Sequence, residues 1–266
     1  MSRFKLIAID MDGTLLNNDL EISPRVEEAI RRVRERDIHV TLCTGRMYAS
    51  ALPYARKMGL DLPLVTYNGA YVKHSGTGEI LYNRNLPVEH AREVFLKAKS
   101  YGFHVNVYYQ DRLYVEQLTE RGKIYARTVR VPIHVVDDML EFLREDPIKI
   151  VVLAEPGQLK DLEGELGAEF GDKLYITKSS STFLEILHPE ATKGRGLQAV
   201  ARYLNVPRES IMGIGDSFND LEMFKYAGFA VVMENAEPEI KSFADYITCC
   251  NDDDGVAEAL EKLVLV

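Results

Sequence analysis

Two aspartates, Asp10 and Asp12, follow directly after the short apolar run Leu6–Ile9. An unbroken apolar run is typical of a central strand in a parallel sheet, because helices cover both faces of such a sheet. The carboxyl end of the strand opens into the crevice where α/β sheets bind ligands. Two carboxylates placed there repel each other unless a proton or a cation lies between them. The pair therefore predicts a metal, a shared proton, or both.

Carboxylates in this position can also act as a nucleophile and as a general acid. The alternative is a turn in which Asp12-Gly13 only reverses the direction of the chain. The segment by itself leaves both interpretations open.

Thr44 marks a second polar strand end. It follows the apolar stretch 38–43 and precedes Gly45. Its hydroxyl and the nearby backbone N–H groups could bind an anion at the start of the next helix. A structural N-cap, in which the threonine serves only its own helix, is the alternative.

Lys193 lies in the first turn of a predicted helix whose N-cap is Thr192. A cation there opposes the helix dipole, at a cost of roughly 0.3 to 1 kcal/mol. A bound phosphate would reverse this argument, because the dipole and the ammonium would then hold the same anion. We therefore expect removal of Lys193 to leave the ligand-free protein unchanged or slightly more stable. An ordinary solvated lysine is the alternative.

Asp216, Asn219 and Asp220 follow another apolar run, 210–214. Their side chains offer hard oxygen ligands that suit Mg2+, which keeps several waters and takes only one or two carboxylates from a protein. A turn followed by an N-capped helix would explain one such segment. It does not explain why acids follow two distant strands, so the two segments together predict a metal site.

Strand-like apolar runs alternate with amphipathic helical segments around these residues, which is typical of βαβ units. Ser23 and Pro24 are a predicted N-cap and first helical residue. The fold class is therefore α/β, with a doubly wound, Rossmann-like core and a parallel sheet. Further strands are expected at 38–43, 64–66, 210–214 and 230–232, and helices from 193 and over 257–263.

The pattern changes near Arg84, where long alternating stretches separated by short turns are typical of antiparallel hairpins. This predicts an α+β cap domain with an antiparallel sheet, inserted into the core. The predicted division assigns 1–83 and 187–266 to the core domain and 84–186 to the cap domain. In the cap domain, strands are expected at 104–109, 113–115, 148–153 and 173–187, and helices at 89–100 and 118–128.

Composition limits the possible partners. The 266 residues, 46% of them hydrophobic, suffice for one large or two modest domains. A formal net charge of -9 without a basic run argues against nucleic acid and anionic membranes as partners. No segment resembles a membrane span. Cys43, Cys249 and Cys250 lack metal-ligand spacing, so a reducing compartment, by default the cytoplasm, is expected.

Three common binding motifs do not match the sequence. Phe218 stands where a dinucleotide fingerprint beginning at Gly213 needs its third glycine. The acids at 10–13 and 216–220 lack the spacing of a calcium loop. The six histidines show no paired spacing that would support a zinc site.

Four motifs occur in order along the chain and together resemble the haloacid dehalogenase (HAD) superfamily of phosphohydrolases. They are Asp10-x-Asp12-Gly13-Thr14, Thr44-Gly45-Arg46, Lys193-Gly194 and Gly215-Asp216-Ser217-x-Asn219-Asp220. Within the superfamily the chain resembles the Cof-type sugar-phosphate phosphatases, because 67–70, the inserted domain and 244–248 also match. One departure is Glu234, in a segment where relatives commonly have Gly-Asn-Ala. It places an acid near a loop that is expected to face the cap.

The resemblance implies a Mg2+-dependent phosphomonoester hydrolase that acts on small phosphorylated metabolites, with sugar phosphates as the expected class. Asp10 would be the nucleophile that forms an aspartyl-phosphate, and Asp12 would protonate the leaving alcohol and then activate water. The implied Mg2+ ligands are the Asp10 carboxylate, the Asp12 backbone carbonyl and Asp216, with Asp220 in support.

The resemblance also implies a phosphate-binding set and a role for the cap. The phosphate-binding groups would be the backbone N–H groups near Met11 and Gly45 and the side chains of Thr44, Lys193 and Asn219. Arg46, Asn68 and Gly69 are further candidates for substrate contact. The cap would close over the site, exclude water and select the leaving group.

Two alternatives to a hydrolase remain. A phosphomutase would use the same aspartyl-phosphate but return the phosphoryl group to another hydroxyl. A non-catalytic sugar-phosphate sensor would keep the pocket while losing Asp10 or Asp12, and both acids are present. In each case the expected partner is a small phosphorylated metabolite, and the protein is expected to be a monomer or small homo-oligomer.

Overall fold

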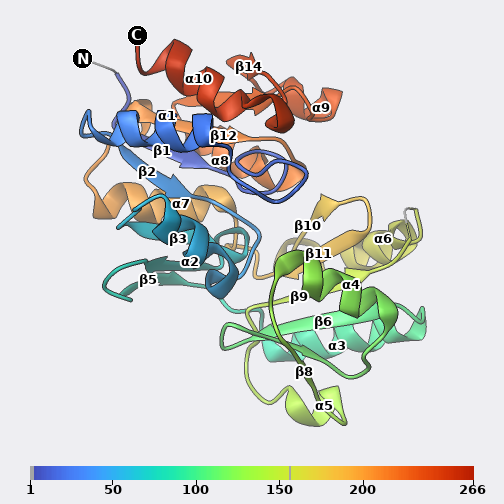
Figure 1. Cartoon of the computed structure of the whole chain (residues 1–266). Coiled ribbons are helices and arrows are strands. Elements are labelled where there is room, and N and C mark those ends of the chain that lie inside the picture. Colours follow the sequence, from blue (N-terminus) through green and yellow to red (C-terminus); the bar gives the residue numbers. More distant parts are fainter. Residues whose placement is uncertain (1–2, 156) are drawn as a thin grey trace.

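A five-stranded sheet forms the centre of the larger part of the molecule in the computed structural model, which describes residues 3–155 and 157–266 (Figure 1). The strand order is β14-β13-β12-β1-β2, and all neighbouring pairs are parallel. We call it the core sheet. Its strands are β1 (Leu6–Ile9), β2 (His39–Leu42), β12 (Ile211–Gly215), β13 (Phe229–Met233) and β14 (Tyr246–Thr248).

Helices cover both faces of the core sheet. Alternate residues of β1 divide between the faces, with Ile7 and Ile9 on one and Leu6 and Ala8 on the other. This double burial explains why β1 is apolar throughout. The first face packs on α1 (Pro24–Arg34), α2 (Tyr48–Lys57) and α10 (Gly255–Leu263), and the second on α7 (Lys193–Tyr203), α8 (Leu221–Tyr226) and α9 (Pro238–Lys241).

A small antiparallel sheet extends the core sheet beyond β2. A parallel bridge between Cys43 and Val65 joins β2 to β3 (Pro63–Thr66). Strand β3 pairs with β4 (Tyr71–His74), which pairs with β5 (Ile80–Asn83). The short helix η1 (Tyr67–Gly69) follows β3.

A separate six-stranded sheet, which we call the cap sheet, has the order β10-β11-β9-β6-β7-β8. Its pairs are antiparallel except β7 with β8, which are parallel. The helix α4 (Glu120–Val129) connects these two strands, and a crossover of this kind is what parallel pairing requires. The strands are β6 (His104–Tyr109), β7 (Arg112–Val115), β8 (Ile133–Val135), β9 (Lys149–Leu153), β10 (Tyr175–Ser180) and β11 (Phe183–Leu187).

One face of the cap sheet packs on its own helices, and the other packs on α4 and on the core. Val105 and Val107 of β6 belong to the first face, and Tyr108 belongs to the second together with Tyr67 of the core. We call the second face the inner face. The helices on the first face are α3 (Val88–Ser100), α5 (Met139–Phe142) and α6 (Leu159–Phe170).

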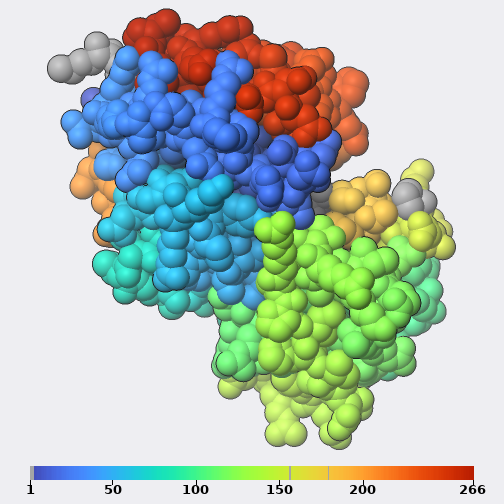
Figure 2. Space-filling view, viewed as in Figure 1, coloured from blue at the N-terminus to red at the C-terminus, as the bar shows by residue number. Residues whose placement is uncertain are grey.

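The chain passes from one sheet to the other just after β5. The N–H of Arg84 still donates to Ala70, whereas the N–H of Leu86 donates to Pro147. The space-filling view shows the segment coloured green packed directly against the segment coloured blue (Figure 2). The predicted α/β class, with a parallel core and a separate, mostly antiparallel sheet, is confirmed. The domain boundaries at 84 and 186 stay a prediction.

The order of the core sheet brings distant polar residues together. Strand β1 lies between β2 and β12, and Ile9 is in register with both Leu42 and Ile214. Asp10 therefore lies beside the ends of two neighbouring strands. Within the described residues, no helix is long and apolar enough to cross a membrane.

Candidate active site

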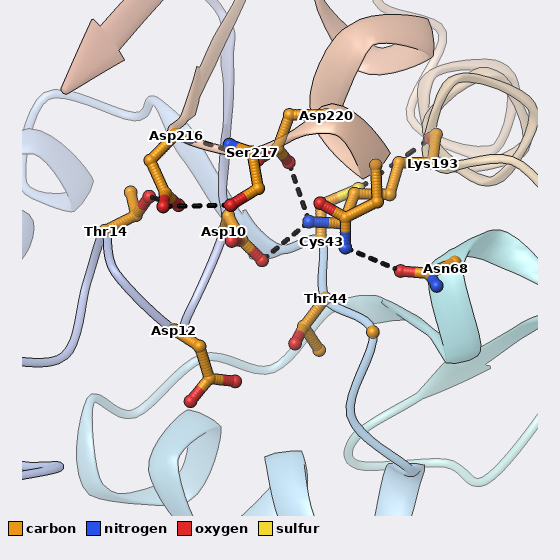
Figure 3. A network of polar contacts seen from close by, with 12 residues as sticks. Asp10, Asp12, Thr14, Cys43, Thr44, Asn68, Lys193, Asp216, Ser217 and Asp220 are labelled. Carbon is orange, nitrogen blue, oxygen red and sulfur yellow. Dashed lines mark hydrogen bonds and ion pairs between the residues drawn. The ribbon is translucent and has the colours of Figure 1, made fainter. Parts of the chain in front are cut away.

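Lys193 links two acids at the carboxyl edge of the core sheet. Its Nζ lies 2.7 Å from Asp10 Oδ1 and 2.6 Å from Asp220 Oδ1. Figure 3 shows the ammonium between the two carboxylates. The Lys193 side chain is fully buried and Asp10 is 4% exposed. Charges this far from solvent persist only when they are paired.

Asp220 has both carboxylate oxygens engaged. Oδ1 accepts from Lys193, and Oδ2 accepts from the backbone N–H groups of Asp216 and Ser217 at 3.1 and 3.0 Å. The latter contacts close a capping box at the start of η4 (Phe218–Asp220), with Ser217 as N-cap. Asp220 therefore fits a supporting role better than that of a direct metal ligand.

Asp216 points its carboxylate toward Asp10 from the end of β12. Thr14 Oγ1 donates to its Oδ1 at 2.8 Å, and Ser217 Oγ donates to its Oδ2 at 3.0 Å. Gly13, at φ 75°, lies so close that a Cβ there would be 2.5 Å from Asp216 Oδ2. Glycine is required at this position by both the backbone conformation and the close approach.

The cluster carries more negative than positive charge. Burial raises the pKa of Asp10 well above its ordinary value, and the Asp220 and Asp216 carboxylates raise it further, against the lowering effect of Lys193. Burial and the Asp220 charge raise the pKa of Asp216 to about 6. Burial alone would lower the pKa of Lys193, but the Asp10 and Asp220 charges outweigh it, so that the pKa is raised.

A divalent cation fits this donor set. One carboxylate oxygen each of Asp10, Asp216 and Asp220 lies within 4.8 Å of the other two. Asp10 and Asp216 could contact the cation directly, with Asp220 in support. All are hard oxygen donors of the kind that Mg2+ prefers. A cation at this position would relieve the repulsion that raises the pKa values of Asp10 and Asp216.

The placement of Lys193 corrects one expectation from the sequence. Thr192 is the N-cap of α7 and Lys193 its first residue, as predicted. The side chain is not a solvated lysine, however, and needs no external anion, because Asp10 and Asp220 already compensate its charge. The expectation that its removal leaves the ligand-free protein unchanged or more stable is therefore wrong, since removal would leave two buried carboxylates without their cation.

Asp12 lies apart from the cluster of Asp10, Asp216 and Asp220. Figure 3 shows its side chain turned away from Asp10 and Asp216. Arg46 binds it in bidentate fashion, with Nε 2.7 Å from Oδ2 and Nη2 2.6 Å from Oδ1. The Asp12 side chain is 51% exposed, whereas that of Arg46 is 3% exposed. Arg46, a predicted substrate contact, is thus the partner of the predicted general acid.

Thr44 caps a turn and not a helix. Its Oγ1 accepts from the N–H of Arg46 at 3.1 Å, while α2 begins only at Tyr48. Thr44 therefore does not lie at the N-terminus of that helix, contrary to the expectation, and its binding of an anion stays a prediction. Because the hydroxyl oxygen accepts this bond, its proton can be donated to a phosphoryl oxygen. Met11 is fully buried in the core, so only its backbone could contact a phosphate.

Asn68 and Gly69 lie behind the site. Asn68 has no exposed surface and connects two other side chains, Asn219 and Glu185. Gly69, at φ 93°, allows η1 to approach α7, since a Cβ there would lie 2.0 Å from the carbonyl oxygen of Thr192. Neither residue lines the cavity at the site, so both positions favour a supporting role over direct substrate contact.

A cavity of about 230 Å³ opens onto the carboxylate cluster. Its core wall includes Gly45 and Asn219 together with Asp10, Asp12 and Arg46. Its other wall comes from the cap region and was missed by sequence reasoning. These residues are Tyr125, Thr128, Val129, Lys149, Phe183 and Glu185. Lys149 and Glu185 could have been found, because Lys149 begins and Glu185 interrupts an otherwise apolar strand.

Glu234 does not reach this cavity. It forms an ion pair with Lys241 at 3.0 Å, and its side chain is 61% exposed. Its neighbour Asn235 instead donates to the carbonyl oxygen of Gly13 at 2.8 Å. The departure from the family pattern at Glu234 therefore leaves the cavity wall unchanged.

The geometry agrees with comparisons to known proteins. Residues 7–260 match the family model of the haloacid dehalogenase-like hydrolases. The chain is 32% identical to the 5-amino-6-(5-phospho-D-ribitylamino)uracil phosphatase YitU of Bacillus subtilis, over 97% of this chain and 96% of that protein. The chain therefore belongs to the haloacid dehalogenase-like hydrolase family, and the prediction of a HAD-type phosphatase is confirmed.

Solved structures with the same fold cover nearly the whole chain. A haloacid dehalogenase-like hydrolase from Bacteroides thetaiotaomicron is 31% identical, with a TM-score of 0.87 over 97% of this chain and 99% of that chain. A protein of Thermotoga maritima is 33% identical, with a TM-score of 0.83 over 97% of each chain.

Proposed function

We propose that this phosphatase hydrolyses small sugar or polyol phosphates through an aspartyl-phosphate on Asp10, with Mg2+ as cofactor. The observation that carries the proposal is the position of Asp10. Its carboxylate lies at the end of β1, is held by Lys193 at 2.7 Å, and faces the same cavity as Asp12. A nucleophile and an acid–base group thus share one site with the buried ammonium of Lys193.

In the first half-reaction an Asp10 oxygen attacks phosphorus and the bond to the ester oxygen breaks. Asp12 gives its proton to the departing alcohol. In the second half-reaction Asp12 takes a proton from water, which attacks phosphorus and releases phosphate from Asp10. Both Asp12 oxygens accept hydrogen bonds from Arg46 in the structure, so each proton transfer requires one of these contacts to open.

Several groups would hold the phosphoryl oxygens during both steps. Lys193, the hydroxyl of Thr44, the amide of Asn219 and backbone N–H groups near Met11 and Gly45 supply donors around Asp10. Preorganised donors of this kind supply most of the stabilisation in phosphoryl transfer. Asp10, Asp216 and the Asp12 backbone carbonyl would hold Mg2+, with Asp220 in support. When bound, the metal supplies positive charge that favours ionised Asp10 and neutralises the phosphoryl group.

The cavity supports a small leaving group. At about 230 Å³ it is bounded by the aromatic rings of Tyr125 and Phe183 and by the hydroxyl of Thr128. The relative YitU acts on a phosphoribityl compound, according to its name. A short polyol or sugar phosphate combines a similar ester with hydroxyls that can bind polar groups in the wall.

The first test replaces the nucleophile. Asp10→Asn should lower phosphate release from p-nitrophenyl phosphate in the presence of Mg2+ by about 10⁴-fold or more, because an amide cannot form the acyl-phosphate. Asp19→Asn, at an exposed position in the same segment, is the matched control and should retain full activity. Near-normal release by a folded Asp10→Asn protein would rule out the assignment.

Two further measurements complete the test. Chelation should abolish phosphate release and added Mg2+ should restore it, so full activity after exhaustive removal of metal would contradict the metal site. A screen of sugar and polyol phosphates without any bisphosphate activator separates hydrolase from mutase. Release of inorganic phosphate under those conditions supports the hydrolase, and isomerised ester in its place supports the mutase.

A further inference from the structure

A second buried ion pair lies across the cavity from the carboxylate cluster. Lys149 of β9 and Glu185 of β11 pair through Nζ and Oε2, and their side chains are 3% and 4% exposed. Both lie on the inner face of the cap sheet, because Val151 of the same face is the register partner of Glu185 and lies two residues from Lys149. The pair is therefore carried entirely by the cap sheet.

Each member of the pair also contacts the core. Lys149 Nζ donates to the carbonyl oxygen of Gly45, the residue after Thr44, at 2.8 Å. Glu185 Oε2 accepts from Asn68 Nδ2 at 3.0 Å. Asn68 Oδ1 in turn accepts from Asn219 Nδ2 at 2.9 Å, the dashed line drawn at Asn68 in Figure 3. A chain of hydrogen bonds thus runs from the cap sheet to Asn219.

Glu185 determines which group donates and which accepts in each of these hydrogen bonds. A carboxylate paired with an ammonium can only accept, so Asn68 must present its NH2 group to it and its carbonyl oxygen to Asn219. Asn219 must then donate to Asn68. Reversing the amide of Asn219 would place two carbonyl oxygens against each other, and reversing Asn68 as well would place a carbonyl oxygen against the Glu185 carboxylate.

The packing leaves little freedom for other arrangements. A Cβ at Gly45 would lie 2.8 Å from Asn68 Oδ1 and 3.6 Å from Asn219 Nδ2. Asn68 has no exposed surface and Asn219 is 3% exposed. The NH2 group of Asn219 has a second hydrogen beyond the one given to Asn68, and Asn219 lines the cavity beside Asp10.

We propose that Glu185, supported by Lys149, is a positioning residue that acts from the cap sheet, through Asn68, to orient the amide of Asn219 toward the transferring phosphoryl group. Docking of the cap sheet then completes the phosphate site as well as enclosing the leaving group. The proposal rests on the proposed function, because it assigns Asn219 to the phosphoryl group. It predicts that loss of Glu185 affects every phosphate ester alike, since the chain ends on the phosphoryl side of the cavity.

The test is a double-mutant cycle between Glu185→Gln and Asn219→Ala. Glutamine has the size of glutamate but can donate as well as accept, so it no longer dictates the orientation of Asn68. We expect Glu185→Gln to lower kcat/KM by about 10-fold or more. The loss should be the same within a factor of three for p-nitrophenyl phosphate, acetyl phosphate and glycerol phosphate. In the Asn219→Ala background the same substitution should cost less than a factor of two, because the group it orients is gone.

The dissociation constant of inorganic phosphate, measured by calorimetry with Mg2+ present, gives the same cycle without turnover. It therefore tests the inference even if no ester is hydrolysed, in which case only the proposed function fails. Independent losses that multiply in the double variant would overturn the inference. So would a loss confined to glycerol phosphate, since Glu185 would then contact the leaving group.

Two controls guard against a loss of fold. Glu169→Gln removes an acid of α6, on the other face of the cap sheet, where it pairs with Lys97. This variant should stay within twofold of the wild type. The combined Lys149→Met and Glu185→Gln variant leaves no unpaired buried charge. It should unfold near the wild-type denaturant midpoint and still show the loss of kcat/KM that depends on Asn219. Wild-type kinetics in this folded variant would overturn the inference.

Discussion

The carboxyl edge of the core sheet and the inner face of the cap sheet both bury charged side chains, but they balance those charges differently. At the core edge one ammonium, that of Lys193, lies among the carboxylates of Asp10, Asp216 and Asp220. On the cap face one ammonium, that of Lys149, is paired with one carboxylate, that of Glu185. The contacts of the cap pair with the core include two neutral groups, a backbone carbonyl and an amide.

This difference separates two tasks within one cavity. Burial, together with the surplus negative charge, raises the pKa values of Asp10 and Asp216. The surplus makes the core edge suited to a cation and to a phosphoryl group bound to that cation. The balanced cap pair has no such surplus. The cap pair can instead orient neutral amide side chains without adding net charge beside the substrate.

The largest effect should follow removal of the core cation. Lys193→Met should lower kcat/KM for phosphate release roughly 30-fold to 1,000-fold, because a charge-assisted contact to the transferring phosphoryl group is lost. It should also lower the free energy of unfolding of the metal-free protein by about 3 kcal/mol, because Asp10 and Asp220 lose their buried partner. Denaturant unfolding and phosphate release can be measured on the same preparation.

A surface lysine provides the control for that experiment. Lys225→Met removes an exposed lysine paired with Glu222 on α8, and we expect less than about 0.5 kcal/mol of change and full activity. Activity of Lys193→Met within threefold of the wild type, or unchanged stability without metal, would show that the core edge does not depend on its cation as described.

A smaller effect should appear in the pH dependence of the metal-free core. Asp216 has a folded pKa of about 6 against an ordinary value of 3.8, so the folded state binds its proton more tightly than the unfolded state. Its contribution to stability is present at low pH and is lost as the pH rises through about 6. Between about pH 7.5 and pH 5, metal-free wild type should gain about 1 to 1.5 kcal/mol relative to Asp216→Asn.

Magnesium should remove this gain. A cation bound between the carboxylates favours their ionised forms, so saturating Mg2+ should stabilise the protein more at pH 7.5 than at pH 5. Chemical denaturation with chelator and with Mg2+ at both pH values checks the prediction. An equal response of wild type and Asp216→Asn to pH would mean that Asp216 is not the group that titrates.

The sequence was sufficient to predict the core edge. Unbroken apolar runs predicted strands that are buried on both faces, and parallel strands end at one edge, so Asp10, Thr44 and Asp216 could be expected to meet. The pairing of Lys193 with Asp10 was not predictable in the same way. Helix-end electrostatics left open whether Lys193 binds an anion or is an ordinary solvated lysine. Its side chain is fully buried, and only the tertiary structure shows the two carboxylates that compensate its charge.

The cap face was much less accessible to sequence reasoning. A charged residue inside an apolar strand signals a buried partner, and Lys149 and Glu185 both gave that signal. Their pairing depends on which strands are neighbours in the cap sheet, and the order β11-β9-β6 does not follow the order along the chain. The link through Asn68 also requires an asparagine at φ 54° between two positive-φ residues, Tyr67 and Gly69, which no local pattern predicts.

The smallest effect concerns the cap alone and should have the opposite sign. His104 of β6 contacts Asn106 through Nε2 and Thr119 through Nδ1. Burial, together with the charge of Arg121, lowers its pKa below the ordinary 6.5, against the raising effect of the Asn106 hydrogen bond. The unfolded state therefore takes up the proton first as the pH falls. The contribution of His104 to stability is present above about pH 6.5 and is lost below it, until the folded state is protonated too.

Relative to His104→Gln, the wild type should lose on the order of 1 kcal/mol between about pH 7.5 and pH 5, as measured by denaturant unfolding. The loss should be the same with chelator and with Mg2+, because the proposed metal site lies among core carboxylates that His104 does not contact. Phosphate release by His104→Gln at pH 7.5 should equal that of the wild type.

A gain in stability on acidification, or a loss of stability that Mg2+ changes, would mean that the cap and the core edge titrate as one unit. The contrast between a core edge with surplus charge and a cap with balanced charge would then fail. Opposite signs in the Asp216 and His104 experiments would instead show that the two regions respond to protons separately, as their different partners require.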